Sequence, residues 1–199
     1  MRSDLRKIIE FIIELDKLKA VLRKTKPVGL DRYENVAEHI WQVCLLAQLL
    51  SDYARTPLDI LRVTELLLVH DITEIDVGDQ IVYQTRDDSR ADAERQAAVR
   101  IFGLLPEHQA GWLMARWQEY EDRKTNEAVF AHAIDRLMPV LHNIHNNGQS
   151  WRENRVPLEK ILAVNAVIGE ACPLVWEYVQ GILMQLSQAG SFDYGIKYT

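Results

Sequence analysis

Residues 66–79 read LLLVHDITEIDVGD, an apolar run that ends in a histidine and an aspartate. Upstream, Thr56 and Pro57 form an N-cap and first-turn proline pattern, which predicts that a helix begins there. The segment between is apolar almost all round, as is typical of a buried helix in the centre of a bundle. An imidazole and a carboxylate at the end of such a helix are costly to bury without compensation. The stretch therefore predicts a helical core with a polar site at its edge.

The rest of the chain has the same helical spacing of apolar residues, and few segments alternate as a half-buried strand would. With 199 residues, of which 48% are hydrophobic, the chain fits one domain with one sizeable core. We predict an all-α fold with one domain over residues 1–188 and a loosely packed C-terminal tail over residues 189–199. The expected helices cover residues 3–22, 35–50, 56–70, 89–102, 106–120, 125–145, 157–168 and 173–187.

Charge and composition exclude several classes of protein. The net charge of −6 argues against a binder of nucleic-acid polymers, which needs a basic surface, but it still allows a local site for a small anion. No apolar run approaches the ~20 residues that a membrane span needs. Cys44 and Cys172 show no CxxC spacing. The N-terminal segment does not fit a signal peptide, because acidic residues interrupt its apolar ones at Asp4, Glu10, Glu14 and Asp16. We expect a cytoplasmic protein.

The residues at the end of the apolar run are candidate metal ligands. Adjacent helical side chains point about 100° apart, so His70 and Asp71 can share an ion only if it lies beside the helix. His39, near the start of the preceding helix, is expected at an exposed helix end that antiparallel packing brings close to this pair. Asp135 lies among small and apolar residues of a later helix. Spacing alone does not single out these four from the other histidines and aspartates.

Four stretches in a fixed order carry a resemblance to a known family. The chain resembles the HD-domain phosphohydrolase superfamily, and within it the 5′-deoxynucleotidase-like branch. The resemblance implies an HD-domain helical bundle of about eight helices and release of phosphate from (deoxy)nucleoside 5′-monophosphates. The stretches are residues 34–39 (ENVAEH), 68–79 (LVHDITEIDVGD), 117–121 (WQEYE) and 133–139 (AIDRLMP).

The resemblance also assigns the metal ligands. It implies that His39, His70, Asp71 and Asp135 bind one divalent ion, and this ligand set suits Mn, Co, Zn, Fe and, less well, Mg. Four protein ligands leave two positions open on a six-coordinate metal, one for water and one for a phosphate oxygen. The ion lowers the pKa of its bound water and polarises the phosphoryl group.

Further residues receive roles in catalysis and substrate binding. The resemblance implies that Glu74 is the general acid/base and that Asp79 orients water or a sugar hydroxyl. It also implies a phosphate-binding arginine in the basic loop, where either Arg23 or Lys24 occupies the matching position. Lysine neutralises a phosphate but does not clamp it in a bidentate manner. The tryptophan that follows this arginine in the bacterial enzyme is absent, which leaves discrimination against a 2′-hydroxyl open.

Several alternatives remain open at this point. The substrate is expected to be a small nucleotide, but an HD hydrolase of another phosphoester, alarmone-type or specialised nucleotide, fits as well. A non-catalytic metal- or nucleotide-binding dimer scaffold is a third interpretation, and the family suggests a homodimer. His132 is interpreted as a packing residue rather than a ligand, and His142 and His145 as exposed. Tyr120 is expected to pack its own helix.

Overall fold

The computed structural model describes residues 2–84, 88–190 and 192, and within them the chain is all-α. The only strand-like feature in this described part is an isolated antiparallel bridge between Leu22 and Asn35. Eight of the described α-helices are at least seven residues long, which confirms the predicted all-α bundle of about eight helices. The elements are α1 (Arg2–Leu15), η1 (Asp16–Ala20), α2 (Val36–Leu50), η2 (Ser51–Tyr53), α3 (Ile60–Val69), α4 (Glu74–Val77), α5 (Asp88–Phe102), α6 (Glu107–Asp122), α7 (Asn126–His145), α8 (Gln149–Glu153), α9 (Leu158–Asn165), α10 (Val167–Ala171) and α11 (Pro173–Gln188).

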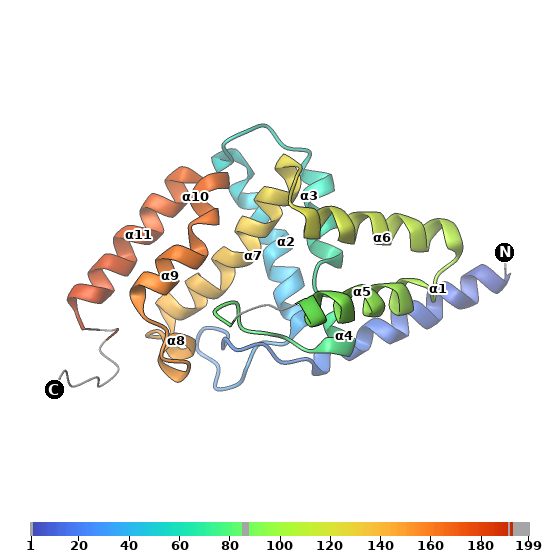
Figure 1. The fold of residues 1–199 in the computed structure, drawn as a ribbon, viewed down its shortest axis with the longest axis horizontal. Helices are drawn as coiled ribbons and strands as arrows, with labels where there is room; N and C mark the ends of the chain where they lie inside the picture. The colour runs from blue at the N-terminus through green and yellow to red at the C-terminus, as the bar shows by residue number, and fades with distance from the viewer. Residues whose placement is uncertain (1, 85–87, 191, 193–199) are drawn as a thin grey trace.

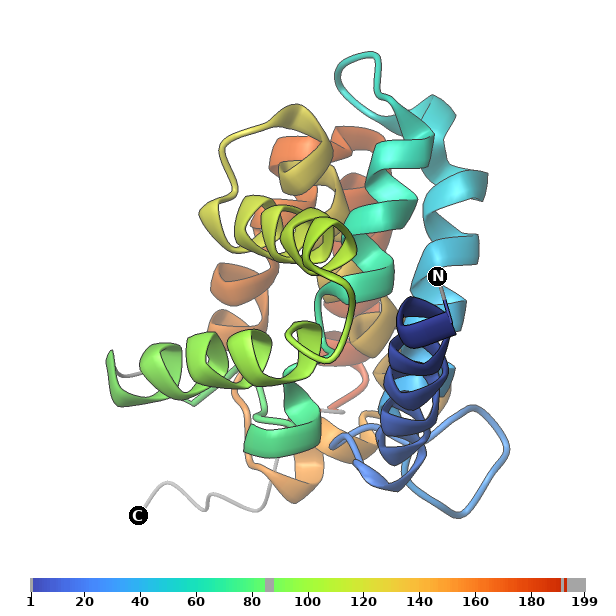
Figure 2. The ribbon, with the colours of Figure 1, turned by 90° about the vertical axis from the view of Figure 1, so that its right-hand side faces the viewer.

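The long helix α7 is the centre of the bundle (Figure 1). It packs against α2, α3, α6 and α10, and eleven of its residues are buried. Helices α9 to α11 lie on one side of it, whereas α1, α5 and α6 extend on the other side (Figures 1 and 2). Two clusters of buried apolar residues form the core. One is built around α3, α7 and α11, and the other around α2, α5 and α6.

The prediction that residues 56–70 form the buried central helix is wrong in two respects. Helix α3 begins at Ile60, because the side chain of Asp59 accepts a hydrogen bond from the backbone amide of Arg62 at 3.2 Å and caps the helix there. In addition, Leu61 and Leu68 are 67% and 52% exposed, so one face of α3 is open. The apolar composition predicted burial, but α7 occupies the central position instead.

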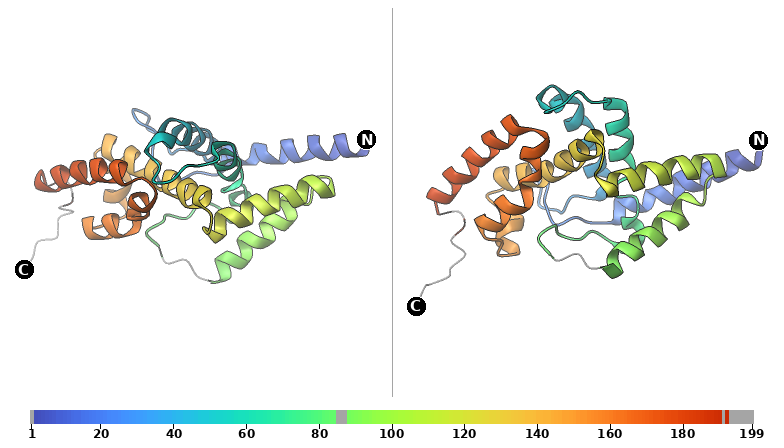
Figure 3. Two further views of the ribbon diagram at one scale, coloured as in Figure 1. Left: turned by 90° about the horizontal axis from the view of Figure 1, so that it is seen from above. Right: turned by 45° about the horizontal axis from the view of Figure 1, so that its top comes forward.

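The first predicted helix is shorter than expected. The α-helical part ends at Leu15, and a 3₁₀ segment continues to Ala20. Helix α1 projects from the body of the bundle (Figure 3). Phe11 is its one buried residue, whereas Ile9 and Ile13 on its apolar side are 53% and 63% exposed. Helix α1 is therefore amphipathic, with an apolar side that the rest of the described chain leaves uncovered.

The predicted C-terminal tail, residues 189–199, falls largely outside the described residues. Of these residues the structure describes Ala189, Gly190 and Phe192, and the ring of Phe192 lies 5.8 Å from that of Trp151. None of the described helices combines the length and hydropathy that a membrane span requires.

Candidate metal centre and active site

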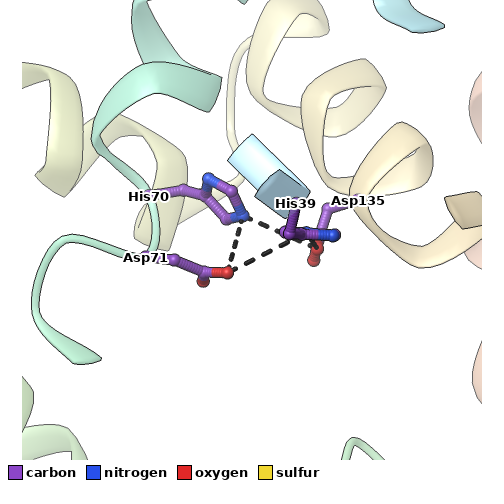
Figure 4. Close-up of side chains that lie close together, drawn as sticks. All are labelled: His39, His70, Asp71 and Asp135. Atoms are coloured by element: carbon purple, nitrogen blue, oxygen red, sulfur yellow. Dashed lines mark hydrogen bonds and ion pairs between the residues drawn. The ribbon is translucent and has the colours of Figure 1, made fainter. Parts of the chain in front are cut away.

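Four side chains from three separate helical segments converge at one point (Figure 4). His39 comes from the first turns of α2, His70 and Asp71 directly follow α3, and Asp135 comes from the middle of α7. One ligand atom from each of the four lies within 4.8 Å of the others. The structure thus brings together the four residues for which the sequence predicted a shared ion.

The distances within this cluster are short. His39 Nε2 lies 3.0 Å from Asp135 Oδ1, and His70 Nε2 lies 3.1 Å from Asp71 Oδ2. Across the cluster, His70 Nε2 is 3.6 Å from Asp135 Oδ1, and His39 Nε2 is 3.9 Å from Asp71 Oδ2. Two imidazole nitrogens and two carboxylate oxygens therefore surround a common centre.

The hydrogen bonding of His70 tests whether a metal fits this centre. Its Nδ1 lies 2.7 Å from the carbonyl oxygen of Leu67 and must donate to it, which leaves the lone pair on Nε2 in the neutral ring. This buried Nε2 has no hydrogen-bond partner, although it faces the carboxylate of Asp71. Two acceptors that face each other are stabilised by a cation between them. The ligand set and its geometry therefore fit a divalent metal.

The charges in the cluster also favour a cation. Burial raises the pKa of Asp71, but the positive charge that His70 carries when it is protonated, together with that of Arg23, outweighs this effect and holds the pKa at about 2. Burial likewise raises the pKa of Asp135, but its hydrogen bond with His39 at 3.0 Å and the nearby ring of His70 bring the pKa well below its usual range. Both carboxylates are therefore ionised at neutral pH.

His39 is not at an exposed helix end, contrary to the expectation. Its side chain is fully buried, with an exposed fraction of 0%. The reason is that residues 21–35 fold back over the start of α2, where the amide of Val36 donates to the carbonyl of Val21 at 3.1 Å. Asn35 and Glu38 form a capping box at this helix start.

Two further carboxyl groups border the centre. Glu74 opens α4 and is 9% exposed, and its buried Oε2 has no hydrogen-bond partner. Burial, followed by the negative charge of Asp71, raises the pKa of Glu74 well above its usual range. Asp79 follows Gly78, whose φ of 70° ends α4, and its Oδ2 also has no partner. Burial raises the pKa of Asp79 although Arg23 opposes this effect.

Arg23 and Lys24 take different positions. The Nη1 atom of Arg23 lies 2.6 Å from Asp71 Oδ2 and 3.7 Å from Asp79 Oδ1, so its guanidinium enters the centre. The side chain of Lys24 is exposed at the rim of the same cleft. Neighbouring residues of an extended segment point to opposite sides, which explains the difference.

Tyr120 contacts the centre and does not only pack its own helix, contrary to the expectation. Its hydroxyl donates a hydrogen bond to Asp135 Oδ2 at 3.0 Å, and its ring lies 5.1 Å from that of His70. Only the resemblance of residues 117–121 to a family stretch pointed to this region. His132 packs behind Tyr120, with Nδ1 3.5 Å from the hydroxyl, and burial lowers its pKa to about 3. It is not part of the cluster of ligand atoms.

Two further residues differ from the sequence-based expectations: His142 is buried, and Glu34, which received no role, lies beside His39. His142 was expected to be exposed, but it is 3% exposed, because α7 continues through the core as far as this residue. Glu34 is 1% exposed, and its Oε2 lies 3.6 Å from His39 Nδ1, on the side of the ring opposite Nε2. Burial raises the pKa of Glu34, but His39 and Arg23 outweigh this effect and lower it overall.

A cleft opens from the cluster toward the surface. Apart from the candidate metal ligands, its lining combines charged, amide and aromatic side chains with a few aliphatic ones, which suits a polar ligand with an aromatic part. These include Arg23, Glu74, Asp79, Gln80, Tyr83 and Arg136.

Comparison with known proteins identifies the family. A family model described as "HD domain" matches residues 15–176, which is most of the chain. The chain belongs to the HD-domain family. This confirms the family that the sequence stretches indicated.

Two curated relatives and one solved structure place the chain within this family. The 5′-deoxynucleotidase HDDC2 of Dictyostelium discoideum is 27% identical over 161 residues, which cover 76% of this chain and 84% of the relative. The human protein of the same name is 30% identical and covers 68% of this chain and 66% of its own length. The crystal structure of a predicted metal-dependent phosphohydrolase from Magnetospirillum magnetotacticum MS-1 is 40% identical, with a TM-score of 0.88 over 95% of this chain and 98% of that one.

Proposed function

We propose that this HD-domain protein is a metal-dependent phosphomonoesterase that releases phosphate from (deoxy)nucleoside 5′-monophosphates. The observation that carries the proposal is the convergence of His39, His70, Asp71 and Asp135, whose ligand atoms lie within 4.8 Å of one another at the base of a polar cleft. The names of the curated relatives, 5′-deoxynucleotidase, support this choice of substrate.

The four ligands would hold one divalent ion, with Mn, Co, Zn, Fe and Mg as candidates. When bound, the ion supplies an activated water and neutralises charge on the phosphoryl group. The chain itself contributes the cation of Arg23, which Asp71 holds at 2.6 Å with further N–H groups left to bind phosphate oxygens.

Glu74 is the proposed proton donor to the leaving group. Burial and the charge of Asp71 raise the pKa of Glu74 and so favour its protonated form, and its unpartnered Oε2 lies free to take part in proton transfer to the 5′-oxygen of the sugar. Asp79 is the proposed positioning group for water or a sugar hydroxyl, since its Oδ2 is also unpartnered. Phosphate esters need such positioning and charge neutralisation, because they hydrolyse extremely slowly alone.

A phosphate-release screen tests this function. The purified protein is incubated with Mn²⁺ or Co²⁺ and each ribo- and deoxynucleoside 5′-monophosphate. Release from at least one of them, lost in His70→Ala together with the bound metal, is expected. No release from any monophosphate by metal-loaded protein overturns the proposal and leaves another phosphoester or a non-catalytic scaffold. The ratio of deoxy to ribo rates answers the open question of 2′-hydroxyl discrimination.

We also propose that the protein forms a homodimer. Trp41, Leu45 and Leu49 lie four residues apart along one side of α2 and are 66%, 46% and 67% exposed. Helix α1 projects nearby with its own uncovered apolar side. Straight apolar stripes of this kind pack against a second copy about a two-fold axis. Light scattering after size exclusion should give twice the chain mass, and Leu45→Glu should give a monomer; a monomeric wild type contradicts the proposal.

A further inference from the structure

Glu34 is a buried carboxylate behind the metal centre, and none of the roles above uses it. Its Oε2 lies 3.6 Å from Nδ1 of His39, the ring nitrogen that does not face the other ligands. The same oxygen lies 3.4 Å from Nε of Arg23. Both nitrogens are buried and neither has a hydrogen-bond partner, so Glu34 is the acceptor within ion-pair reach of both.

Backbone pairing fixes where Glu34 lies. The amide of Arg23 donates to the carbonyl of Glu34 at 2.9 Å, and the amide of Glu34 donates to the carbonyl of Thr25 at 2.9 Å. These bonds flank the antiparallel bridge between Leu22 and Asn35. The carboxylate therefore projects from a backbone that is held on both sides, between the start of α2 and the Arg23 segment.

The chemistry of a histidine ligand explains why a carboxylate in this place matters. His39 offers its Nε2 lone pair to a metal only when the proton is on Nδ1. A carboxylate that faces Nδ1 stabilises this tautomer, fixes the ring orientation and makes Nε2 more basic. On its other side, the negative charge of Glu34 holds Nε of Arg23 and thereby leaves the Nη groups directed at the cleft.

We propose that Glu34 is a positioning residue that orients both His39 for the metal and Arg23 for the phosphate. The Arg23 part rests on the proposed function, whereas the His39 part concerns metal binding alone. His142 also approaches Glu34, with Nδ1 at 3.9 Å, but it offers no atom to the ligand cluster and is assigned no part in this role.

Glu34→Gln tests the proposal, because it keeps the size of the side chain but removes its charge. Titration of metal-free protein with MnCl₂ in a calorimeter should show an affinity about 10- to 100-fold weaker than in the wild type. Long-range ¹H–¹⁵N NMR spectra of the imidazoles should show a smaller share of the His39 tautomer with its proton on Nδ1 than in the wild type. At saturating Mn²⁺, kcat of Glu34→Gln for a nucleoside monophosphate should be close to that of the wild type, whereas its KM should be several-fold higher.

Glu38→Gln is the matched control. It is the same substitution one residue before the ligand, at a side chain that is 38% exposed and pairs with Arg32. Glutamine preserves the capping box, so Mn²⁺ affinity should stay within about twofold of the wild type. Glu34→Asp keeps the charge but moves it back by one methylene, so this variant should bind Mn²⁺ with intermediate affinity. It serves as the test if Glu34→Gln does not fold.

The outcomes separate this inference from the proposed function. Wild-type affinity for Mn²⁺ and an unchanged His39 tautomer in the folded Glu34 variants overturn the inference, even if the wild type is an active phosphatase. Weakened Mn²⁺ binding in Glu34→Gln supports it, even if the wild type releases no phosphate from any nucleotide.

Discussion

Nη1 of Arg23 lies 2.6 Å from Oδ2 of Asp71, the same oxygen that lies 3.1 Å from Nε2 of His70. A candidate phosphate ligand and a candidate metal ligand are thus joined through one carboxylate. A phosphoryl group bound at this centre would therefore be within reach of the guanidinium. Under the proposed function, the geometry of the arginine, and not only its charge, would then matter for substrate binding.

We predict that Arg23→Lys lowers kcat/KM about 10- to 100-fold, because an ammonium group cannot hold Asp71 and also donate two parallel bonds to phosphate. Steady-state phosphate release with the best nucleoside monophosphate measures this effect. Lys24→Ala is the control, since Lys24 is exposed at the rim. A larger loss in Lys24→Ala than in Arg23→Lys would reverse the assignment.

We predict that Tyr120→Phe weakens Mn²⁺ binding about tenfold, because it removes the hydroxyl that donates to Asp135 Oδ2 at 3.0 Å. The loss of this buried hydrogen bond should also lower the free energy of unfolding by about 1 kcal/mol. Calorimetric titration and urea unfolding measure the two effects. Tyr178→Phe, at a side chain that is 70% exposed, should change neither. Unaltered Mn²⁺ affinity in Tyr120→Phe would mean that the hydroxyl does not orient Asp135.

The sequence predicted a polar site at His70 and Asp71 because polar groups that end an apolar helix need a partner, whereas the choice of His39 and Asp135 as their partners depended on the family resemblance. It also predicted most helices, since their apolar spacing and caps are local signals. The burial of His142 was missed because local sequence does not show which end of a long helix crosses the core. Tyr120 and Glu34 were missed because their roles depend on which segments meet in space: α6 beside α7, and residues 21–35 over the start of α2.

We predict that Glu74→Gln lowers kcat by about 10² to 10⁴ and leaves Mn²⁺ affinity near that of the wild type, because Glu74 is proposed to transfer a proton and is not one of the four ligands. Single-turnover phosphate release and calorimetry separate the two quantities. Asp76→Asn serves as the control, since Asp76 lies on the same short helix but pairs with Arg100 at the surface. Full activity of Glu74→Gln would show that Glu74 does not transfer a proton in the reaction.

Removal of the metal should destabilise the fold. An ion present at 100 times its dissociation constant contributes about 2.7 kcal/mol to the native state, so chelation should lower the Tm by roughly 5 to 10 °C. Differential scanning fluorimetry with Mn²⁺ and with EDTA measures the shift. In His70→Ala the two curves should coincide; an equal shift in this variant would place the stabilising ion elsewhere.

The last prediction concerns stability at acid pH. Glu119 on α6 accepts hydrogen bonds from Arg62 on α3 at 2.6 Å and from Thr125, the N-cap of α7, at 2.8 Å. Burial raises the pKa of Glu119, but these hydrogen bonds outweigh it, and its pKa in the folded state is below the usual value. The unfolded chain therefore binds this proton more readily than the folded one.

The stabilisation from Glu119 should be fully present above the unfolded pKa of about 4.3 and should be lost as the pH falls through the lower folded value. Glu119→Gln should lower the free energy of unfolding by about 1 kcal/mol at pH 7, since Arg62 is partly exposed and its pairing is screened. Urea unfolding from pH 7 to pH 3 should show this difference shrinking below about pH 4. Glu177 is exposed, so Glu177→Gln should have the wild-type free energy of unfolding at every pH. If the loss of stability in Glu119→Gln is the same at every pH, the ionised carboxylate is not the group that stabilises the contact between the three helices.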